Sequence, residues 1–310
     1  MVTDTNFRGW MHRISGALHR HPRLRLVLLL GLPLLWLVGV YGGSLVALLS
    51  QSFFSLDDFS GTIDRTLTME TWGDLFTDSN ISIAIRTTVM ATAVTIGAAI
   101  IAFPIAFYAV RYAGSRLRAV FFILILIPLW SSYLVRVYSW KLILAREGIL
   151  FWFVDKLGLN VLLDTALSTP GIGGPSLSAS ALGQFIVFVY IWLPYMILPI
   201  HAALERVPKS YLEASADLGA KPLQTFRTVI WPLAIPGIAA GSIFTFSLTL
   251  GDYIIPTIIG DSSPFVGLAI YSYQGVAGNL PLAAAFTFFP IVIMGIYLYL
   301  ARRAGAFEAL

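Results

Sequence analysis

Long apolar runs separated by short polar stretches dominate the pattern along the chain. Six runs are long enough to cross the roughly 30 Å hydrocarbon core of a membrane, which takes about 20 helical residues. They cover residues 24–49, 82–109, 119–143, 181–203, 234–259 and 283–302. The alternating ten-residue strands of a membrane barrel are absent from the sequence. The pattern therefore predicts an all-α integral membrane protein with six transmembrane helices.

The composition agrees with this prediction and excludes several classes of chemistry. Apolar residues make up 57% of the 310 residues and charged residues 12%, whereas charged residues make up about a quarter of a soluble domain. The chain has no cysteine, which excludes disulfides and thiol catalysis. Its four histidines lack metal-site spacing, and the sequence has no Gly-Lys-Ser or Gly-Lys-Thr for a phosphate-binding loop. We therefore expect no catalytic residue, no metal site and no cofactor in this chain.

Basic residues are distributed unevenly between the two sides of the predicted bundle. Fourteen of the 20 lie in the amino-terminal tail, the second and fourth connections and the carboxyl-terminal end. The connections on the other side are acidic instead, beginning with Asp57, Asp64 and Glu70. Because cytoplasmic segments are enriched in lysine and arginine, both termini are expected in the cytoplasm. The net charge of +4 then reflects membrane topology, and no nucleic-acid partner is expected.

The predicted organisation follows from the spans and their orientation. A cytoplasmic tail (1–23) precedes the first transmembrane helix and a periplasmic loop (24–80). The main transmembrane domain (81–302) contains a cytoplasmic loop (204–232), and a cytoplasmic tail (303–310) ends the chain. The loop 204–232 is the longest cytoplasmic connection, and it is polar in an otherwise apolar chain.

Within this loop, the stretch YLEASADLGAKPLQTFRTVIWP (211–232) is expected to form two short helices. Ser210 and Glu213 match the S-x-x-E capping box of a helix start. Gly219 suits a left-handed helix stop, and Pro222 suits the first turn of a second helix.

The first of these helices is amphipathic. One side carries Tyr211, Leu212, Ser215 and Leu218. Glu213 and Asp217 occupy another side. A helix this short buries little surface by itself, so we expect it to dock into a partner. The alternative is a helix lying on lipid, which would favour lysine and arginine on its polar face rather than carboxylates.

The spacing of this segment resembles the EAA loop of ABC importer permeases. That pattern reads EAA, three residues, Gly, nine residues, then Ile-x-Leu-Pro, and Glu213, Gly219 and Pro232 match it. Ser215 replaces the second alanine, and Trp231 replaces the leucine. The resemblance implies a type I ABC importer permease with the MetI-like fold, whose cytoplasmic coupling helix binds a separate ATPase subunit. The implied coupling residues are Tyr211, Glu213, Ala214, Asp217 and Gly219.

Two further stretches are similar to the permeases of spermidine/putrescine ABC importers: SSYLVRVYSWKLIL (131–144) and LGDYIIPTIIG (250–260). This resemblance implies polyamine transport across a bacterial inner membrane. Relatives with similar stretches carry other small solutes, namely opines, phosphonates and metal ions, so these remain alternatives. The implied partners are two copies of an ATPase, which binds the ATP, a second related permease, and a periplasmic or lipid-anchored solute-binding protein.

Charged residues inside apolar spans often mark a transport path, because each costs about 2.5–3.5 kcal/mol to insert. Arg136, Lys141 and Asp252 lie well inside predicted spans, near their outer ends. The candidate path residues are Asp252, Tyr133, Arg136, Tyr138 and Trp140, and Trp130 and Trp192 could join them through cation–π contacts. The alternatives are snorkelling cations, a structural Arg136–Asp252 ion pair, and an aromatic belt at the membrane surface.

The sequence fits two other classes of membrane protein less well than the importer. An ion-driven secondary transporter is typically built from inverted repeats around buried ionisable groups, but Asp252 is the one carboxylate within a predicted span. A membrane anchor or scaffold would leave the spacing of Glu213, Gly219 and Pro232 without an explanation.

Overall fold

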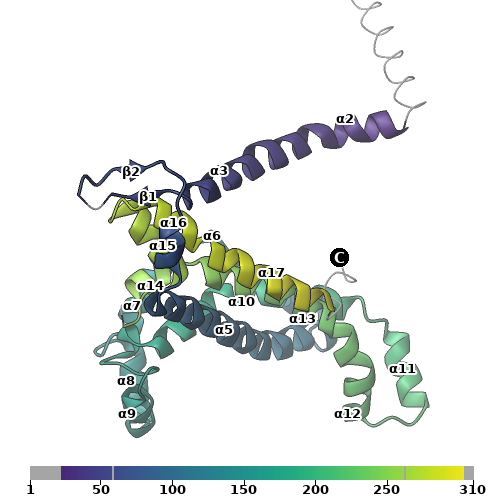
Figure 1. Cartoon of the computed structure of the whole chain (residues 1–310). Helices are drawn as coiled ribbons and strands as arrows, with labels where there is room; N and C mark the ends of the chain where they lie inside the picture. The colour runs from purple at the N-terminus through teal and green to yellow at the C-terminus, as the bar shows by residue number, and fades with distance from the viewer. Residues whose placement is uncertain (1–21, 58, 262, 304–310) are drawn as a thin grey trace, which may run out of the picture.

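The fold is a bundle of helices around three long central ones (Figure 1). The computed structural model describes residues 22–57, 59–261 and 263–303, so the predicted tails lie almost entirely outside the described residues. The central helices are α5 (Asp78–Arg111), α10 (Ala181–Glu205) and α13 (Trp231–Gly251), which pack against one another. The largest apolar core of the described chain lies largely among them.

Small side chains allow these three helices to approach closely. Ala91, Ala98, Ala102 and Ala106 of α5 are fully buried, and their spacing of seven and four residues places them on one helix face. Small residues at helix contacts are typical of membrane bundles, where packing rather than water exclusion holds helices together. On α13, Gly237 faces α10 so closely that an added Cβ would lie 2.5 Å from the Cβ of Ala203.

The first predicted span stands apart from this bundle (Figure 1). It is built from α2 (Pro22–Leu35), a π-helical stretch (Trp36–Gly42) and α3 (Gly43–Gln51). The continuous apolar helix Leu26–Gln51 has no buried residue. Its length and composition suit a membrane span, as predicted.

A second, smaller core lies at one end of the bundle. It joins Leu75, Val266 and Phe286 with their neighbours, and the hydroxyl of Thr87 on α5 accepts a 3.0 Å hydrogen bond from the Val266 N–H. The elements at this end are β1 (Ser55–Leu56) paired antiparallel with β2 (Ile63–Asp64), α4 (Glu70–Leu75), α15 (Val266–Gly275) and α16 (Leu280–Phe286). The last span continues from α16 into α17 (Phe288–Arg303).

Two predicted spans are interrupted, which corrects their predicted bounds. The run 119–143 forms α6 (Ser115–Trp130) and α7 (Tyr133–Ile143), which are bent by 97° at Ser131 and Ser132. The position of Arg136 therefore does not follow from a straight third helix. Two short helices and a 3₁₀ turn follow: α8 (Ile149–Lys156), α9 (Asn160–Ser168) and Leu177–Ala179.

The run 234–259 is interrupted in the same way. Helix α13 ends at Gly251, Asp252 is extended, and α14 (Ile254–Ile258) is a separate short helix. The described chain therefore has five long apolar helices, or six spans if α6 and α7 count as one. This confirms the predicted all-α membrane fold.

Two sets of connecting elements lie at opposite ends of the bundle. Helices α11 (Lys209–Asp217) and α12 (Pro222–Thr225) project beyond one end, where α17 also terminates (Figure 1). The β1–β2 hairpin and α16 lie at the opposite end (Figure 1).

Candidate functional site

The polar loop folds into a helical hairpin at one end of the bundle. Its first helix, α11, begins at Lys209 after Pro208 and has no side-chain cap. The predicted capping box is therefore wrong. Pro208 occupies the N-cap position, and Ser210 lies inside the first turn of the helix. Proline supplies the extended backbone from which the helix starts (φ −63°, ψ 143°).

The turn of the hairpin is as predicted. Gly219 has a φ of +74°, which a residue without a Cβ adopts without strain. Pro222 occupies the first turn of α12, and α12 continues through a π-helical stretch (Phe226–Ile230) into α13. The helical run Pro222–Gly251 is 30 residues long, so the hairpin is connected to the bundle by one uninterrupted helix.

Helix α11 uses one face to pack within the hairpin. Leu212 contacts the main apolar core, and the hydroxyls of Ser215 and Thr225 lie 2.8 Å apart. Tyr211 and Leu218 lie on the same side of α11 as Ser215, as predicted, and are 54% and 88% exposed. They line an open groove of about 560 Å³ between α11 and the start of α13.

The predicted coupling residues all remain available to a partner. Each is exposed in the described structure: Tyr211, Glu213, Ala214, Asp217 and Gly219. The large Trp231 of the loop pattern is accommodated by an aromatic cluster, with ring centroids 5.5 Å from Phe103 and 6.2 Å from Phe226. The hairpin therefore presents two carboxylates and an aromatic side chain on a well-packed base.

A second candidate site lies where the two interrupted spans meet. Asp252 sits between α13 and α14, and one of its carboxylate oxygens accepts a 2.9 Å hydrogen bond from the Ile255 N–H. The other oxygen accepts a hydrogen bond from the hydroxyl of Tyr133, the first residue of α7. Asp252 therefore holds the start of α14 against the start of α7. It is buried, with 9% of its surface exposed.

Aromatic rings surround the Tyr133–Asp252 contact on one side. Trp192 of α10 stacks on Tyr133 at 5.7 Å between ring centroids, and Tyr195 lies 5.9 Å from Trp192. The guanidinium of Arg136 lies 5.8 Å from the centre of the Tyr133 ring. These residues form a half-buried cluster of one carboxylate, one guanidinium and three aromatic rings.

The predicted Arg136–Asp252 ion pair does not form. Both carboxylate oxygens are already hydrogen-bonded to other groups, and the buried Nε and Nη1 of Arg136 have no hydrogen-bond partner in the described chain. Arg136 is therefore a largely unpaired cation beside Tyr133.

The other predicted path residues are not brought into this cluster. Tyr138 and Trp130 are 54% and 88% exposed, and Trp140 packs on Tyr190 at 5.0 Å. Sequence reasoning missed Gln184, whose buried amide donates a 2.7 Å hydrogen bond to the Ile259 carbonyl at the end of α14. A glutamine within an otherwise apolar span was the available signal.

Comparison with known proteins identifies relatives along the whole chain. The family described as "Binding-protein-dependent transport system inner membrane component" matches residues 100–305. The chain is 52% identical over 309 residues to the inner membrane ABC transporter permease protein YdcU of Escherichia coli K12, covering 100% of this chain and 99% of that protein. It is 28% identical over 284 residues to the spermidine/putrescine transport system permease protein PotB of E. coli K12, covering 90% and 94%.

A solved structure has a similar fold. It is a bacterial ABC transporter involved in the import of the acidic polysaccharide alginate, with a TM-score of 0.68, 14% identity, and coverage of 94% of this chain and 99% of that one. At this identity the likeness concerns the fold alone, and it confirms the type I importer permease fold that the EAA spacing implied. The chain, a multi-pass inner-membrane ABC importer permease, therefore belongs to the family of binding-protein-dependent transport system inner membrane components.

Proposed function

We propose that this permease conducts a polyamine-class organic cation, such as putrescine or spermidine, into the cytoplasm. The similarity to the spermidine/putrescine permease PotB extends over 90% of the chain, which supports the same solute class. In this proposal the solute arrives on a periplasmic or lipid-anchored binding protein. A second, related permease completes the path, and two ATPase copies supply the energy.

The cluster around Asp252 carries the chemical part of the proposal. An alkylammonium ion that enters an apolar bundle loses hydration, and a carboxylate together with aromatic faces offsets part of that cost. Asp252 is the one carboxylate within the six spans predicted from the sequence, and the rings of Tyr133 and Trp192 lie beside it. In this role Asp252 would exchange its contact with Tyr133 for a contact with the solute.

One observation favours a second candidate, an anionic small solute such as an opine or a phosphonate. Arg136 lies within the same cluster, and two of its buried N–H groups have no partner among the described residues. An unpaired guanidinium can donate hydrogen bonds to a carboxylate or phosphonate group. The two candidates therefore differ in which charged residue of the cluster meets the solute.

The ATPase is proposed to bind α11. The surface of α11 exposes the carboxylates of Glu213 and Asp217, and Tyr211 lines an open groove beside the helix. Such a surface suits a soluble protein partner better than a lipid surface, which favours basic helices.

Uptake by cells that express the permease with its own partner subunits tests the solute class. We expect energy-dependent uptake of radiolabelled putrescine or spermidine, and its loss in Asp252→Asn. Asparagine keeps both contacts, because its carbonyl oxygen can accept from Ile255 and its amide can donate to the Tyr133 oxygen, so the change removes mainly the charge. Membrane abundance of the variant should stay normal.

Arg136→Gln serves as the opposite test. A polyamine permease should retain uptake in this variant, because the removed cation only repels the solute. Polyamine uptake that is unaffected by Asp252→Asn would contradict the path role. Absence of polyamine uptake, with an Arg136-dependent uptake of an opine or phosphonate, would favour the second candidate.

A further inference from the structure

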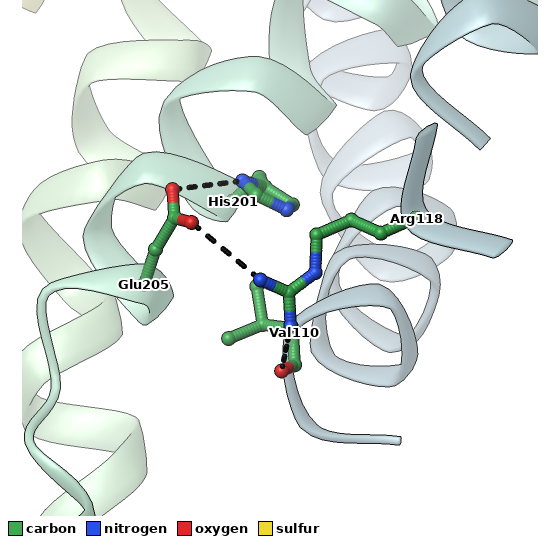
Figure 2. Close-up of polar contacts among 4 residues, drawn as sticks. All are labelled: Val110, Arg118, His201 and Glu205. Carbon is green, nitrogen blue, oxygen red and sulfur yellow. Dashed lines mark hydrogen bonds and ion pairs between the residues drawn. The ribbon is translucent and has the colours of Figure 1, made fainter. Parts of the chain in front are cut away.

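A short connector, residues 205–208, runs from the last residue of α10 to the start of α11. It is held by two arginines, one at the end of α5 and one in the first turn of α6. Arg111, the last residue of α5, donates a long hydrogen bond of 3.5 Å to the Val207 carbonyl. Arg118, in the first turn of α6, lies 3.7 Å from the Glu205 carboxylate (Figure 2). Both contacts reach the connector immediately before α11 begins.

Arg118 also links this contact back to α5. Its Nη2 donates a 3.0 Å hydrogen bond to the Val110 carbonyl in the last turn of α5 (Figure 2). One guanidinium therefore bridges the end of α5 and the end of α10. The fork of an arginine suits this arrangement, because its separate N–H groups bind two acceptors at once.

A second contact between α6 and α10 lies one helical turn further into the bundle. Phe122 of α6 packs edge-to-face on His201 of α10 at 4.6 Å, and His201 Nδ1 lies 3.8 Å from Glu205 (Figure 2). Arg118 and Phe122 are four residues apart on α6, as His201 and Glu205 are on α10, so each pair shares a helix face. Helices α6 and α10 therefore meet through two side-chain pairs, Arg118 with Glu205 and Phe122 with His201.

The three central helices differ in how the chain connects them to the hairpin. Helix α10 leads directly into the connector, and α13 continues without interruption from α12, so two central helices are linked to the hairpin through the chain. The third, α5, is separated from the hairpin by about 100 residues of chain and lacks such a link. Among the described residues, Arg111 and Arg118 provide polar links from the end of α5 to the connector.

We propose that Arg111 and Arg118 are positioning residues that make α5 move together with α11 when the ATPase displaces the hairpin. This inference rests on the proposed function, in which the ATPase binds α11. The Arg118 and Glu205 side chains are 35% and 56% exposed, and ion pairs this exposed stabilise a fold little. The role of the two arginines is instead to keep the end of α5 and the connector in the same relative position through the transport cycle.

The experiment uses the complete complex in lipid nanodiscs. Because this chain has no cysteine, spin labels attach within it only at introduced cysteines, here Tyr112→Cys after α5 and Lys221→Cys at the start of α12. The chain is labelled before it is assembled with its partner subunits. The distance between the labels is measured with and without ATP. In the parent protein we expect a narrow distance distribution in both states, since α5 and the hairpin move as one body.

The double variant Arg111→Gln with Arg118→Gln should broaden the distribution when ATP is bound. The single variant Arg118→Lys should give an intermediate result, because lysine keeps the charge near Glu205 but cannot bridge to Val110 with the same fork. Arg116→Gln is the matched control: Arg116 is an exposed arginine on the same turn, and its loss should leave the distribution narrow.

The outcomes separate this inference from the proposed function. Binding of the ATPase itself is read from the mobility of the label at position 221 in the room-temperature spectrum, with and without the ATPase subunits. If the ATPase leaves this mobility unchanged, α11 is not the docking site, and the docking part of the proposed function and this inference are both wrong. If the label responds but the double variant keeps a narrow distribution with ATP, the ATPase does bind α11 and only the positioning role is rejected. A purely structural role would lower yield and thermal stability without an ATP-dependent change in distance.

Discussion

At the scale of single residues, Gly237 decides how closely α13 approaches α10. A Cβ at this position would lie 2.5 Å from the Ala203 Cβ and 2.7 Å from the Pro199 carbonyl oxygen. Gly237→Ala should therefore force the helices apart and destabilise the protein by about 1–3 kcal/mol, as overpacking does. Thermal unfolding of the purified permease in detergent measures this change.

Gly295→Ala is the matched control for this prediction. Gly295 is also helical, but it is exposed, and nothing lies within 4 Å of an added Cβ. Alanine there should leave stability unchanged or raise it by about 0.4–1 kcal/mol, because it restricts the unfolded chain. Equal effects of the two substitutions would show that close packing at Gly237 does not contribute to stability.

Asp252 shows how far sequence reasoning reaches at this scale. Its rarity within an apolar span identified it as a candidate, and the structure places it in a polar cluster with two other predicted residues, Tyr133 and Arg136. Its partners were not predictable, because they depend on where α6 bends. A straight α6–α7 helix suggested pairing with Arg136, whereas the bend presents the Tyr133 hydroxyl instead.

At the scale of elements, Gly219 determines the shape of the α11–α12 hairpin. Its φ is +74° and the space around a Cβ is open, so any penalty for a side chain comes from the backbone alone. Gly219→Val should distort the turn and uncouple ATP hydrolysis from transport while the protein remains in the membrane. Transport and ATPase activity of the reconstituted complex, measured together, test this.

Gly219→Asn provides the matched variant, because asparagine tolerates the left-handed conformation far better than a β-branched residue does. It should retain most coupling although it adds a side chain of similar volume. Loss of coupling in both variants would point to a direct contact of Gly219 with the ATPase. Normal transport and normal complex yield in Gly219→Val would contradict the role of the turn.

The elements differ in how well the sequence specifies them. The hairpin was readable because glycine and proline mark its turn and its second helix through backbone geometry. The breaks at Ser131–Ser132 and at Asp252 were not, because the apolar run continues across both of them. Hydropathy indicates that a segment lies in the membrane but does not depend on the direction of its helix axis. A 97° bend therefore changes the hydropathy pattern very little.

At the scale of the whole molecule, the two ends of the bundle have different tasks. One end carries the hairpin and the connector clamped by Arg111 and Arg118. The opposite end carries the small β1–β2 sheet and the second apolar core around Phe286. The break between α13 and α14 lies toward the second of these ends, beside α15 (Figure 1), where a solute would enter from a binding protein under the proposed function.

The orientation of these ends follows from charge and is testable by labelling. The hairpin end is expected to face the cytoplasm, because most basic residues lie on that side. The β1–β2 turn around Ser60 would then face the periplasm. Since the chain has no cysteine and Ser60 is exposed, Ser60→Cys should react with an impermeant thiol reagent in cells whose inner membrane is intact.

Leu218→Cys gives the opposite expectation from a comparably accessible position. Leu218 is 88% exposed at the end of α11, so its cysteine should react only after the inner membrane is opened. A third site, Ser176→Cys, should label from the periplasm more slowly, because Ser176 is half-buried and its hydroxyl lies 2.9 Å from that of Ser178. The reverse pattern, with Leu218→Cys labelled in intact cells and Ser60→Cys protected, would invert the topology and place α11 out of reach of a cytoplasmic ATPase.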